Sequence, residues 1–244
     1  MSPRLATFSA AAVGAALITG GMAYAALYPG SQIFGRVLVS GKDPRQLALT
    51  FDDGPNPTVT PQILDLLALN GAKATFFLIG TFVRRHPRLA RAVLEAGHLV
   101  GNHTMTHPRL AWQSAKRIRR EIVDANALLE DVLGTRVRHF RPPHGARRPY
   151  VIEVANELGL TTVQWNVTAS DWKPIPAQEI VANVERGIAR NKRKGRSSNI
   201  LLHDGGHLSL GADRLATLRA TAQLLRRDSG ESFVTIDRWQ EAQR

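Results

Sequence analysis

The sequence predicts an α/β fold in which a single domain, a distorted (β/α)7 barrel, follows a hydrophobic N-terminal segment. After residue 45, seven strand-like runs alternate with six amphipathic, helix-like runs. Glycine follows four of the helix-like runs directly, as expected at helix ends, because glycine adopts the left-handed conformation without a Cβ clash. Regular alternation of this kind implies a mostly parallel sheet with right-handed crossovers, closed or nearly closed into a barrel.

The predicted elements follow one another through residues 46–236. The predicted strands are 46–51, 74–79, 98–101, 137–140, 161–165, 199–203 and 233–236. The predicted helices are 61–70, 87–96, 110–133, 149–158, 177–190 and 213–227. In a parallel barrel, reactive side chains lie at the carboxyl ends of the strands, so a site is expected there.

The composition is that of a globular protein with a sizeable core: 244 residues, of which 43% are hydrophobic and 21% charged. The absence of cysteine excludes disulfides and thiolate metal sites. The net charge is +12, but the basic residues are scattered, and no aromatic residues interleave with the densest run, 192–196. This run is interpreted as a solvated loop or as a region attracted to anionic lipid or acidic wall polymer, and no nucleic-acid partner is expected.

The N-terminus is predicted to be a targeting segment. Residues 5–28 contain no charged side chain and are long enough to cross a bilayer as a helix. This length favours a retained signal anchor over residues 1–28, while the small residues Ala23 and Ala25 also suit a cleaved signal peptide. Residues 29–44 are predicted to be a linker, and residues 45–244 the folded domain.

Two adjacent carboxylates, Asp52 and Asp53, end the first predicted strand, and Gly54 and Pro55 break the strand directly afterwards. Adjacent carboxylates repel each other unless a cation or a proton separates their roles. Because neighbouring side chains of a strand point to opposite faces, one carboxylate can bind a metal while the other acts as a free base. A simple Asx-Gly turn is the alternative interpretation of this motif alone.

Two histidines, His103 and His107, follow the third predicted strand. Histidines four residues apart lie on one face of a helical turn, so their ring nitrogens can converge on one ion. With one aspartate they make a set that leaves positions open for water and substrate, as catalytic zinc requires. The remaining candidates have no partner at such a spacing and are interpreted as structural or exposed: His86, His98, His139 and His207.

Three further strand ends carry reactive side chains. Arg141 follows the fourth strand and can hold a carboxylate such as Asp52 by bidentate hydrogen bonds, with His144 three residues later. Asp171 lies in the loop after the fifth strand, and His203 ends the sixth. A carboxylate beside an imidazole raises the imidazole pKa and fixes its tautomer, which is the arrangement of a general acid.

This ordered set of motifs resembles the polysaccharide deacetylase family, carbohydrate esterase family 4, typified by chitooligosaccharide deacetylases, over roughly residues 46–236. The matching motifs are Thr50–Pro55, His103–His107, Arg141–Gly145, Asp171-Trp172 and Leu201–His203. The resemblance implies a distorted (β/α) barrel, usually with seven strands. It also implies a hydrolase that removes N-acetyl groups from N-acetylglucosamine-type residues of a polysaccharide or oligosaccharide.

The resemblance implies a role for each matching residue. The implied ligands of one divalent metal ion, with zinc expected, are Asp53, His103 and His107. The implied catalytic residues are Asp52 as the base for a metal-activated water, Arg141 orienting it, His203 as the acid and Asp171 tuning that acid. The implied substrate-binding residues are His144, Trp172 and Leu201.

Two departures from the family pattern bear on substrate fit: His144 stands where tyrosine is common, and the loop 166–170 lacks a frequent aspartate. Three alternatives stay open: a deformylase or other amidohydrolase acting on a lipid-linked amino sugar, a catalytically silent carbohydrate-binding relative, and a nucleic-acid binder. The expected partners are an acetylated glycan and, through the N-terminal segment, a membrane. The domain is expected outside the cytoplasm, anchored or secreted, and no oligomeric state is predicted.

Overall fold

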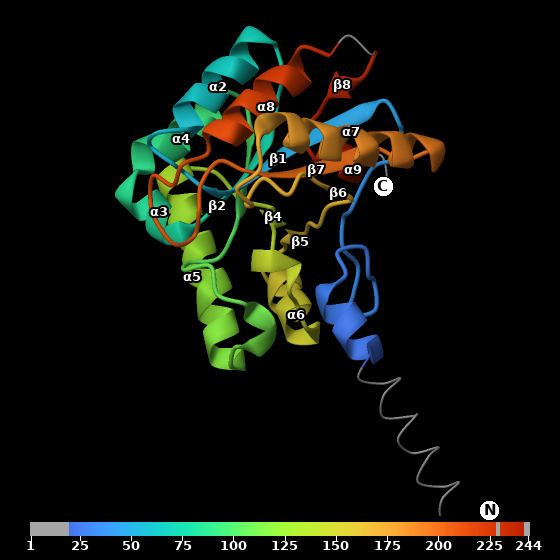
Figure 1. The fold of residues 1–244 in the computed structure, drawn as a ribbon. Coiled ribbons are helices and arrows are strands. Elements are labelled where there is room, and N and C mark those ends of the chain that lie inside the picture. The colour runs from blue at the N-terminus through green and yellow to red at the C-terminus, as the bar shows by residue number, and fades with distance from the viewer. Residues whose placement is uncertain (1–19, 228–229, 242–244) are drawn as a thin grey trace, which may run out of the picture.

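The computed structural model describes residues 20–227 and 230–241, whose paired strands all run parallel in one curled sheet (Figure 1). The strands are β1 (Gln46–Gly54), β2 (Thr75–Leu78), β3 (Leu99–Asn102), β4 (His139–Phe140), β5 (Thr161–Thr162), β6 (Val167–Thr168), β7 (Ser198–His203) and β8 (Ser232–Phe233). Their order is β5-β4-β3-β2-β1-β7-β6, and β8 pairs with the start of β1. Since β5 and β6 lie at opposite edges of this order, the sheet is an open half-barrel.

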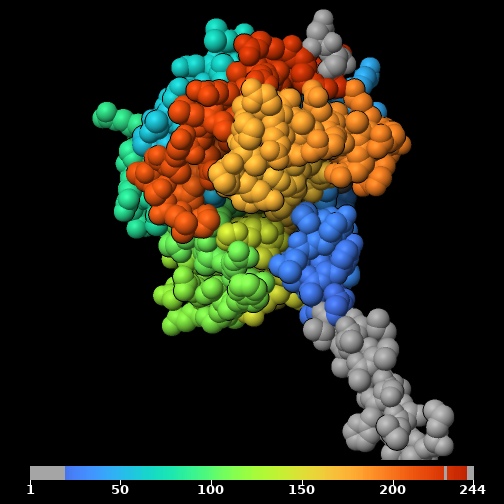
Figure 2. All heavy atoms as spheres, in the orientation of Figure 1, coloured from blue at the N-terminus to red at the C-terminus, as the bar shows by residue number. Residues whose placement is uncertain are grey.

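Helices connect the strands and pack along the outside of the sheet (Figure 1). The α-helices are α2 (Thr60–Leu69), α3 (Gly80–Arg85), α4 (Pro87–Glu95), α5 (Ala115–Leu133), α6 (Pro149–Glu157), α7 (Ala177–Arg193), α8 (Leu215–Leu225) and α9 (Arg238–Glu241). Single turns of 3-10 helix are η1 (Leu110–Trp112) and η2 (Pro143–Gly145). In Figure 2, α7 and α8, in orange and red, lie side by side across one face.

The predicted alternation of strands and helices is confirmed, with local differences. The predicted strand 161–165 is shorter in the structure: β5 ends at Thr162, and Val163 forms an isolated parallel bridge with Leu38 of the N-terminal segment. The predicted helix 110–133 begins only at Ala115, where the Ser114 hydroxyl caps it by accepting a hydrogen bond from the amide of Arg117. Helices α3 and α9 were not predicted, since both are too short to show a clear helical period.

Strand β1 lies in the middle of the sheet and separates an apolar layer from a polar interior. Phe51 is fully buried and stacks on Phe76 of β2, with 5.0 Å between the ring centroids, in the cluster beneath the helices. Its neighbours Thr50 and Asp52 point to the other side, where both accept hydrogen bonds from the buried guanidinium of Arg141. The same strand therefore supports the core and presents polar groups to the inside of the half-barrel.

Residues 29–44, which the sequence predicts to be a linker, pack against the domain. Leu38 forms a parallel bridge with Val163 beside the β5 edge. The fully buried guanidinium of Arg147 donates hydrogen bonds to the carbonyl oxygens of Ser31 (2.7 Å) and Gly145 (3.1 Å), and also reaches the carbonyls of residues 28 and 29. Arg147 thus fastens the N-terminal segment to the loop that follows β4.

The predicted targeting segment is only partly described. Residues 20–27 are helical, and the aromatic rings of Tyr24 and Tyr28 stack at 4.8 Å on a half-exposed face. Within residues 20–227 and 230–241, no helix combines the length and the apolarity needed to cross a bilayer. Residues 5–19 of the predicted hydrophobic segment lie outside the described ranges.

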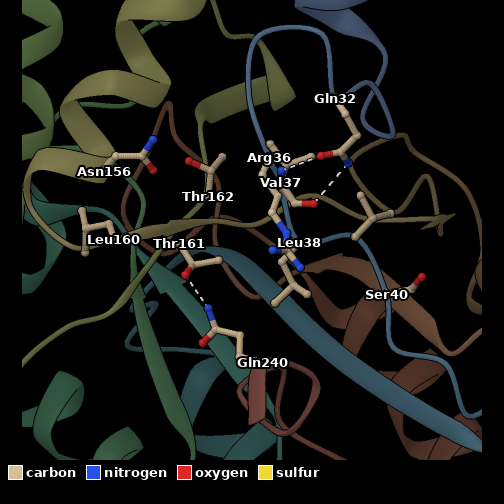
Figure 3. A pocket seen from close by; sticks show the side chains of 11 residues that line it. Gln32, Arg36, Val37, Leu38, Ser40, Asn156, Leu160, Thr161, Thr162 and Gln240 are labelled. Atoms are coloured by element: carbon tan, nitrogen blue, oxygen red, sulfur yellow. Dashed lines mark hydrogen bonds between the residues drawn. The ribbon is translucent and has the colours of Figure 1, made fainter. Parts of the chain in front are cut away.

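A cavity of about 440 Å³ lies between residues 32–40 and the start of β5 (Figure 3). Hydrogen bonds within the fold hold its polar lining: the amide of Val37 donates to Gln32 Oε1 (2.8 Å), and Gln240 donates to Thr161 Oγ1. Its described lining contains no histidine, aspartate or glutamate. The predicted catalytic chemistry therefore lies elsewhere.

Replacing Arg147 by methionine is expected to lower the free energy of unfolding by about 2–4 kcal/mol, because it leaves buried carbonyl oxygens without donors. Urea unfolding measures the loss, and limited proteolysis reports release of residues 26–31. Arg84→Met, at an exposed arginine of α3, is the matched control. Equal unfolding midpoints for the two variants would show that the Arg147 contacts contribute nothing.

Candidate active site

A pocket of about 630 Å³ opens where the carboxyl ends of the strands meet. Eight of the ten site residues predicted from the sequence line it: Asp52, Asp53, His103, His107, His144, Trp172, Leu201 and His203. The other two, Arg141 and Asp171, are buried behind the lining and bond to Asp52 and His203. The fold therefore brings the predicted residues together in one place.

Asp52 and Asp53 both face the pocket, which strict alternation along a strand would not allow. Asp53 has a left-handed backbone (φ 69°), and the register of β1 with β2 shifts between Asp52 and Gly54. The interpretation that the two side chains point to opposite faces is therefore wrong. The local bulge lets one pocket hold two carboxylates with different partners.

His103 and His107 converge through a turn rather than through the helical turn that their spacing predicts. Thr104 (φ 67°) and His107 (φ 60°) both have left-handed backbones. Side chains of this segment replace the missing helical hydrogen bonds: Asn102 Oδ1 accepts from the Thr104 amide (2.8 Å), and Thr104 Oγ1 accepts from the His107 amide (3.0 Å). As a result, the Nε2 atoms of the two histidines lie 3.4 Å and 3.0 Å from Asp53 Oδ1.

The ligand atoms of Asp53, His103 and His107 are arranged as a cation-binding site requires. His103 donates Nδ1–H to the Arg141 carbonyl (2.7 Å), so its Nε2 lone pair faces Asp53. Asp53 Oδ1 is buried and lacks a hydrogen-bond partner within the described residues. Burial raises the pKa of Asp53, but the side chains of His103, His107 and His207 that face its carboxylate lower the pKa more and leave it well below its usual value. An ionised carboxylate and two ring nitrogens thus face one point.

Arg141 provides the counter-charge of Asp52 from beneath the pocket. Its Nη1 donates to Asp52 Oδ1 (2.7 Å) and to Thr50 Oγ1 (2.8 Å), while Nη2 points to Asn199 Oδ1 (3.4 Å). The predicted pairing is confirmed, but the predicted bidentate geometry is wrong, because Asn199 takes the second nitrogen. The guanidinium also lies 4.1 Å from the ring centroid of Phe77. Asp52 is thereby held through one oxygen only.

His203 and Asp171 form the predicted imidazole–carboxylate pair. Asp171 Oδ1 accepts Nδ1–H of His203 (2.8 Å), and Asp171 Oδ2 accepts both the His203 amide (2.7 Å) and the Thr217 hydroxyl (2.9 Å). Burial lowers the pKa of His203, but attraction to Asp171, and then to Asp53 and Asp52, outweighs it and raises the pKa to about 9. The imidazole is therefore protonated at neutral pH.

Aromatic and apolar side chains shape the pocket wall. Trp172, which is 46% exposed, packs its ring against His203 at 5.6 Å, and Leu201 is buried on the same side. His144 also lines the pocket and has a left-handed conformation (φ 58°). Burial and the neighbouring charges lower the pKa of His144 to about 4, so this imidazole is neutral near pH 7. The lining therefore combines apolar side chains with several imidazoles.

The loop after β7 brings His207, which was not predicted as a site residue, into the pocket. His207 stacks on His107 at 4.4 Å, and its Nδ1 lies 3.7 Å from Asp53 Oδ2. Asp204, in the same loop but not among the lining residues, is fully buried, accepts a hydrogen bond from Thr60, and has a pKa that burial raises to about 7. His207 follows His203 by four residues across two glycines, the same spacing as His103 and His107, and this signal could have placed it.

The loop after β7 can approach Asp53 only because residue 205 is glycine. A Cβ added at Gly205 would lie 2.0 Å from the carbonyl oxygen of Asp53. The sequence pattern groups His207 with His86, His98 and His139 as structural or exposed; it is exposed, but it lines the pocket. Two others of this group lie outside the pocket: His98 Nδ1 accepts the amide of Ala74, and His139 bonds to Gln240. His207 therefore reaches the pocket because the backbone of its loop passes close to Asp53.

Replacing Arg141 by methionine is expected to lower the free energy of unfolding by about 3–5 kcal/mol, because it leaves the buried carboxylate of Asp52 without its counter-charge. The double variant Arg141→Met with Asp52→Asn is expected to regain part of this loss. Urea unfolding of the two single variants and the double variant measures the coupling. Additive losses would mean that the buried pair does not interact energetically.

Comparison with known proteins agrees with this geometry. The family model described as polysaccharide deacetylase matches residues 40–163. A chitooligosaccharide deacetylase of Azorhizobium caulinodans is 37% identical over 71% of this chain and 80% of its own length. A peptidoglycan-N-acetylglucosamine deacetylase of Bacillus cereus is 39% identical over 78% of this chain and 85% of its own. A crystal structure of a peptidoglycan N-acetylglucosamine deacetylase has a TM-score of 0.71 at 33% identity, covering 82% of this chain and 91% of that one. The resemblance seen in the sequence is confirmed, and this chain belongs to the polysaccharide deacetylase family.

Proposed function

We propose that this protein is a metal-dependent hydrolase that removes the N-acetyl group from N-acetylglucosamine-type residues of a polysaccharide or oligosaccharide. One observation carries the proposal: the ligand atoms of Asp53, His103 and His107 face one another in a pocket that also holds Asp52 and His203. The names of the relatives, which are deacetylases of chitooligosaccharides and of peptidoglycan, support an acetamido group as the target.

Asp53, His103 and His107 are the residues that would hold the metal. Two imidazole nitrogens and one carboxylate favour zinc over magnesium or calcium, which prefer oxygen ligands. When bound, the ion supplies positive charge that polarises the acetamido carbonyl and lowers the pKa of a water molecule.

Asp52 is the general base in this proposal. Arg141 holds its Oδ1 at 2.7 Å, which directs Oδ2 toward the imidazoles, 3.7 Å from His103 Nε2. A carboxylate held in this way takes a proton from the attacking water while the water oxygen bonds to the carbonyl carbon. Arg141 is a positioning residue, because it acts through Asp52.

His203 is the general acid. Asp171 accepts Nδ1–H, so Nε2 carries the second proton of the imidazolium. Transfer of this proton to the amine nitrogen, as the carbon–nitrogen bond breaks, releases acetate and a free amino sugar. Asp171 keeps the acid protonated and oriented, and Thr217 holds Asp171 in turn.

The pocket wall supplies substrate contacts. Leu201 and Trp172 offer apolar surface for the acetyl methyl group, and the half-exposed Trp172 ring offers a face for a sugar. The backbone N–H of His144 is proposed as a donor to the oxyanion that develops on the carbonyl. The His144 side chain contacts the sugar where relatives often have tyrosine.

The N-terminal segment is proposed to place the enzyme outside the cytoplasm. Residues 1–28 act as a signal anchor, or as a signal peptide that is removed, and residues 45–244 are the catalytic domain. Glycans of the kind named for the relatives are then accessible from the membrane surface.

Acetate release from N-acetylated chitooligosaccharides and peptidoglycan, with N-formylated substrates in parallel, tests the function. The full chain is expected to release acetate. Acetate release is expected to stop when a chelator removes the metal and to resume when zinc is added. Asp52→Asn is expected to lower turnover at least ~10²-fold while still binding zinc. Asp65→Asn, at an exposed carboxylate of α2, is the control. Faster formate than acetate release, or normal turnover by Asp52→Asn, would contradict the assignment.

The pH dependence of kcat/KM tests the acid. Protonated His203 is required, so kcat/KM is expected to fall as the pH rises through about 9. Asp171→Asn removes the carboxylate that raises the pKa of His203 most. The fall in kcat/KM is then expected at a lower pH, toward the ordinary histidine pKa of 6.5. Asp124→Asn, at an exposed carboxylate of α5, should leave the profile unchanged. If kcat/KM of Asp171→Asn falls at the same alkaline pH as that of the wild type, His203 is not the general acid.

A further inference from the structure

A second group of metal-binding atoms lies beside the first, at the outer part of the same pocket. One ring nitrogen from each of His107, His144 and His207 lies within 4.8 Å of the other two. We name these three residues the outer histidine cluster. His107 also belongs to the inner group with Asp53 and His103. The cluster comes from the loops after β3, β4 and β7, so only the fold brings it together.

The imidazole rings of the outer histidine cluster contact one another directly. The ring of His107 stacks on that of His207 (4.4 Å, 21°) and meets that of His144 edge-on (4.8 Å, 73°). The rings of His144 and His207 are nearly perpendicular at 5.5 Å. Three imidazoles gathered in this way supply several nitrogen donors to a small volume, as transition-metal sites do.

His107 has a ring nitrogen whose bonding capacity the fold leaves unmet. Its Nε2 is 3.0 Å from Asp53 Oδ1 in the inner group. Its Nδ1 is buried and has no hydrogen-bond partner within the described ranges. His103 differs, because its Nδ1–H is donated to the Arg141 carbonyl in the manner usual for a metal-bound histidine. His107, which belongs to both groups, thus lacks the supporting hydrogen bond that His103 has.

Asp53 connects the inner group with the outer histidine cluster. Its Oδ1 faces His103 and His107, whereas its Oδ2 lies 3.7 Å from His207 Nδ1. A carboxylate with one oxygen toward each group can lie between two ions. His144 and His207 are exposed to solvent, so an ion can reach them directly.

We propose that the outer histidine cluster binds a second divalent transition-metal ion, more weakly than the inner group, and that this ion obstructs substrate entry. Weaker binding follows because a neutral imidazole has one lone pair: with Nε2 of His107 toward the inner group, the second ion has to displace the Nδ1 proton to solvent, and His144 and His207 supply no counter-charge. Obstruction follows because His144 and His207 line the pocket that the acetamido group has to enter. The obstruction of substrate entry rests on the proposed function of the pocket, whereas the binding of a second ion does not.

Zinc titration of the metal-free full chain by calorimetry tests the site. The wild type is expected to bind two ions of unequal affinity. His207→Gln and His144→Gln are each expected to keep the tight ion and to lose at least ~10-fold in affinity for the second. His86→Gln, outside the pocket, is the matched control and should bind two ions. His144→Tyr, with the residue common in the family, replaces His144→Gln if circular dichroism shows that the latter does not fold.

Binding of a single ion by the wild type at every zinc concentration, or two unchanged affinities in both cluster variants, would overturn the second site. Acetate release measured at increasing zinc tests the obstruction: KM should rise in the wild type as the second ion binds, and much less in His207→Gln. Two zinc-binding steps together with no acetate release even at zinc concentrations that fill only the tight site would refute the deacetylase proposal and leave the second site standing. Acetate release with one bound ion throughout would refute the second site alone.

Discussion

The buried guanidinium of Arg141 is the group on which the arrangement of the site depends. Two carboxylates on successive residues, Asp52 and Asp53, would repel each other in an interior of low dielectric constant. Arg141 neutralises Asp52 from below, and the imidazoles face Asp53 from the side, so each carboxylate has its own partner. Phe77 packs against the guanidinium and keeps it away from water. The division of roles between the two carboxylates follows from this separation of counter-charges.

The loops around the pocket store conformational strain. Every non-glycine residue with a left-handed backbone in the described ranges lies at the end of β1 or in a loop that follows another strand: Asp53, Thr104, His107, His144 and Ser170. Such a conformation costs on the order of 1–3 kcal/mol per residue and persists only where neighbouring contacts determine it. Here the hydrogen bonds of Asn102 and Thr104 supply such contacts. The rigid half-barrel therefore supports a site whose backbone would not adopt this form alone.

The open side of the half-barrel gives the N-terminal segment a structural role. Leu38 pairs beside β5, and Arg147 joins residues 28–31 to the carbonyl of Gly145, next to His144. The segment that enters the domain from the predicted membrane side thus contacts the loop that forms one wall of the pocket. A single buried arginine therefore joins the N-terminal segment to the loop that carries His144.

The sequence by itself determined the strand–helix alternation and the residue types at five strand ends, because parallel strands bring those ends to one edge. It therefore placed Asp52, His103 and His203 near one another. Only the tertiary structure decided which atoms meet, since contacts between distant loops select the partners. Asn199 takes the second nitrogen of Arg141, and Gly205 lets the loop of His207 approach Asp53. Spacing along the chain does not predict these contacts, because they form only when the sheet curls.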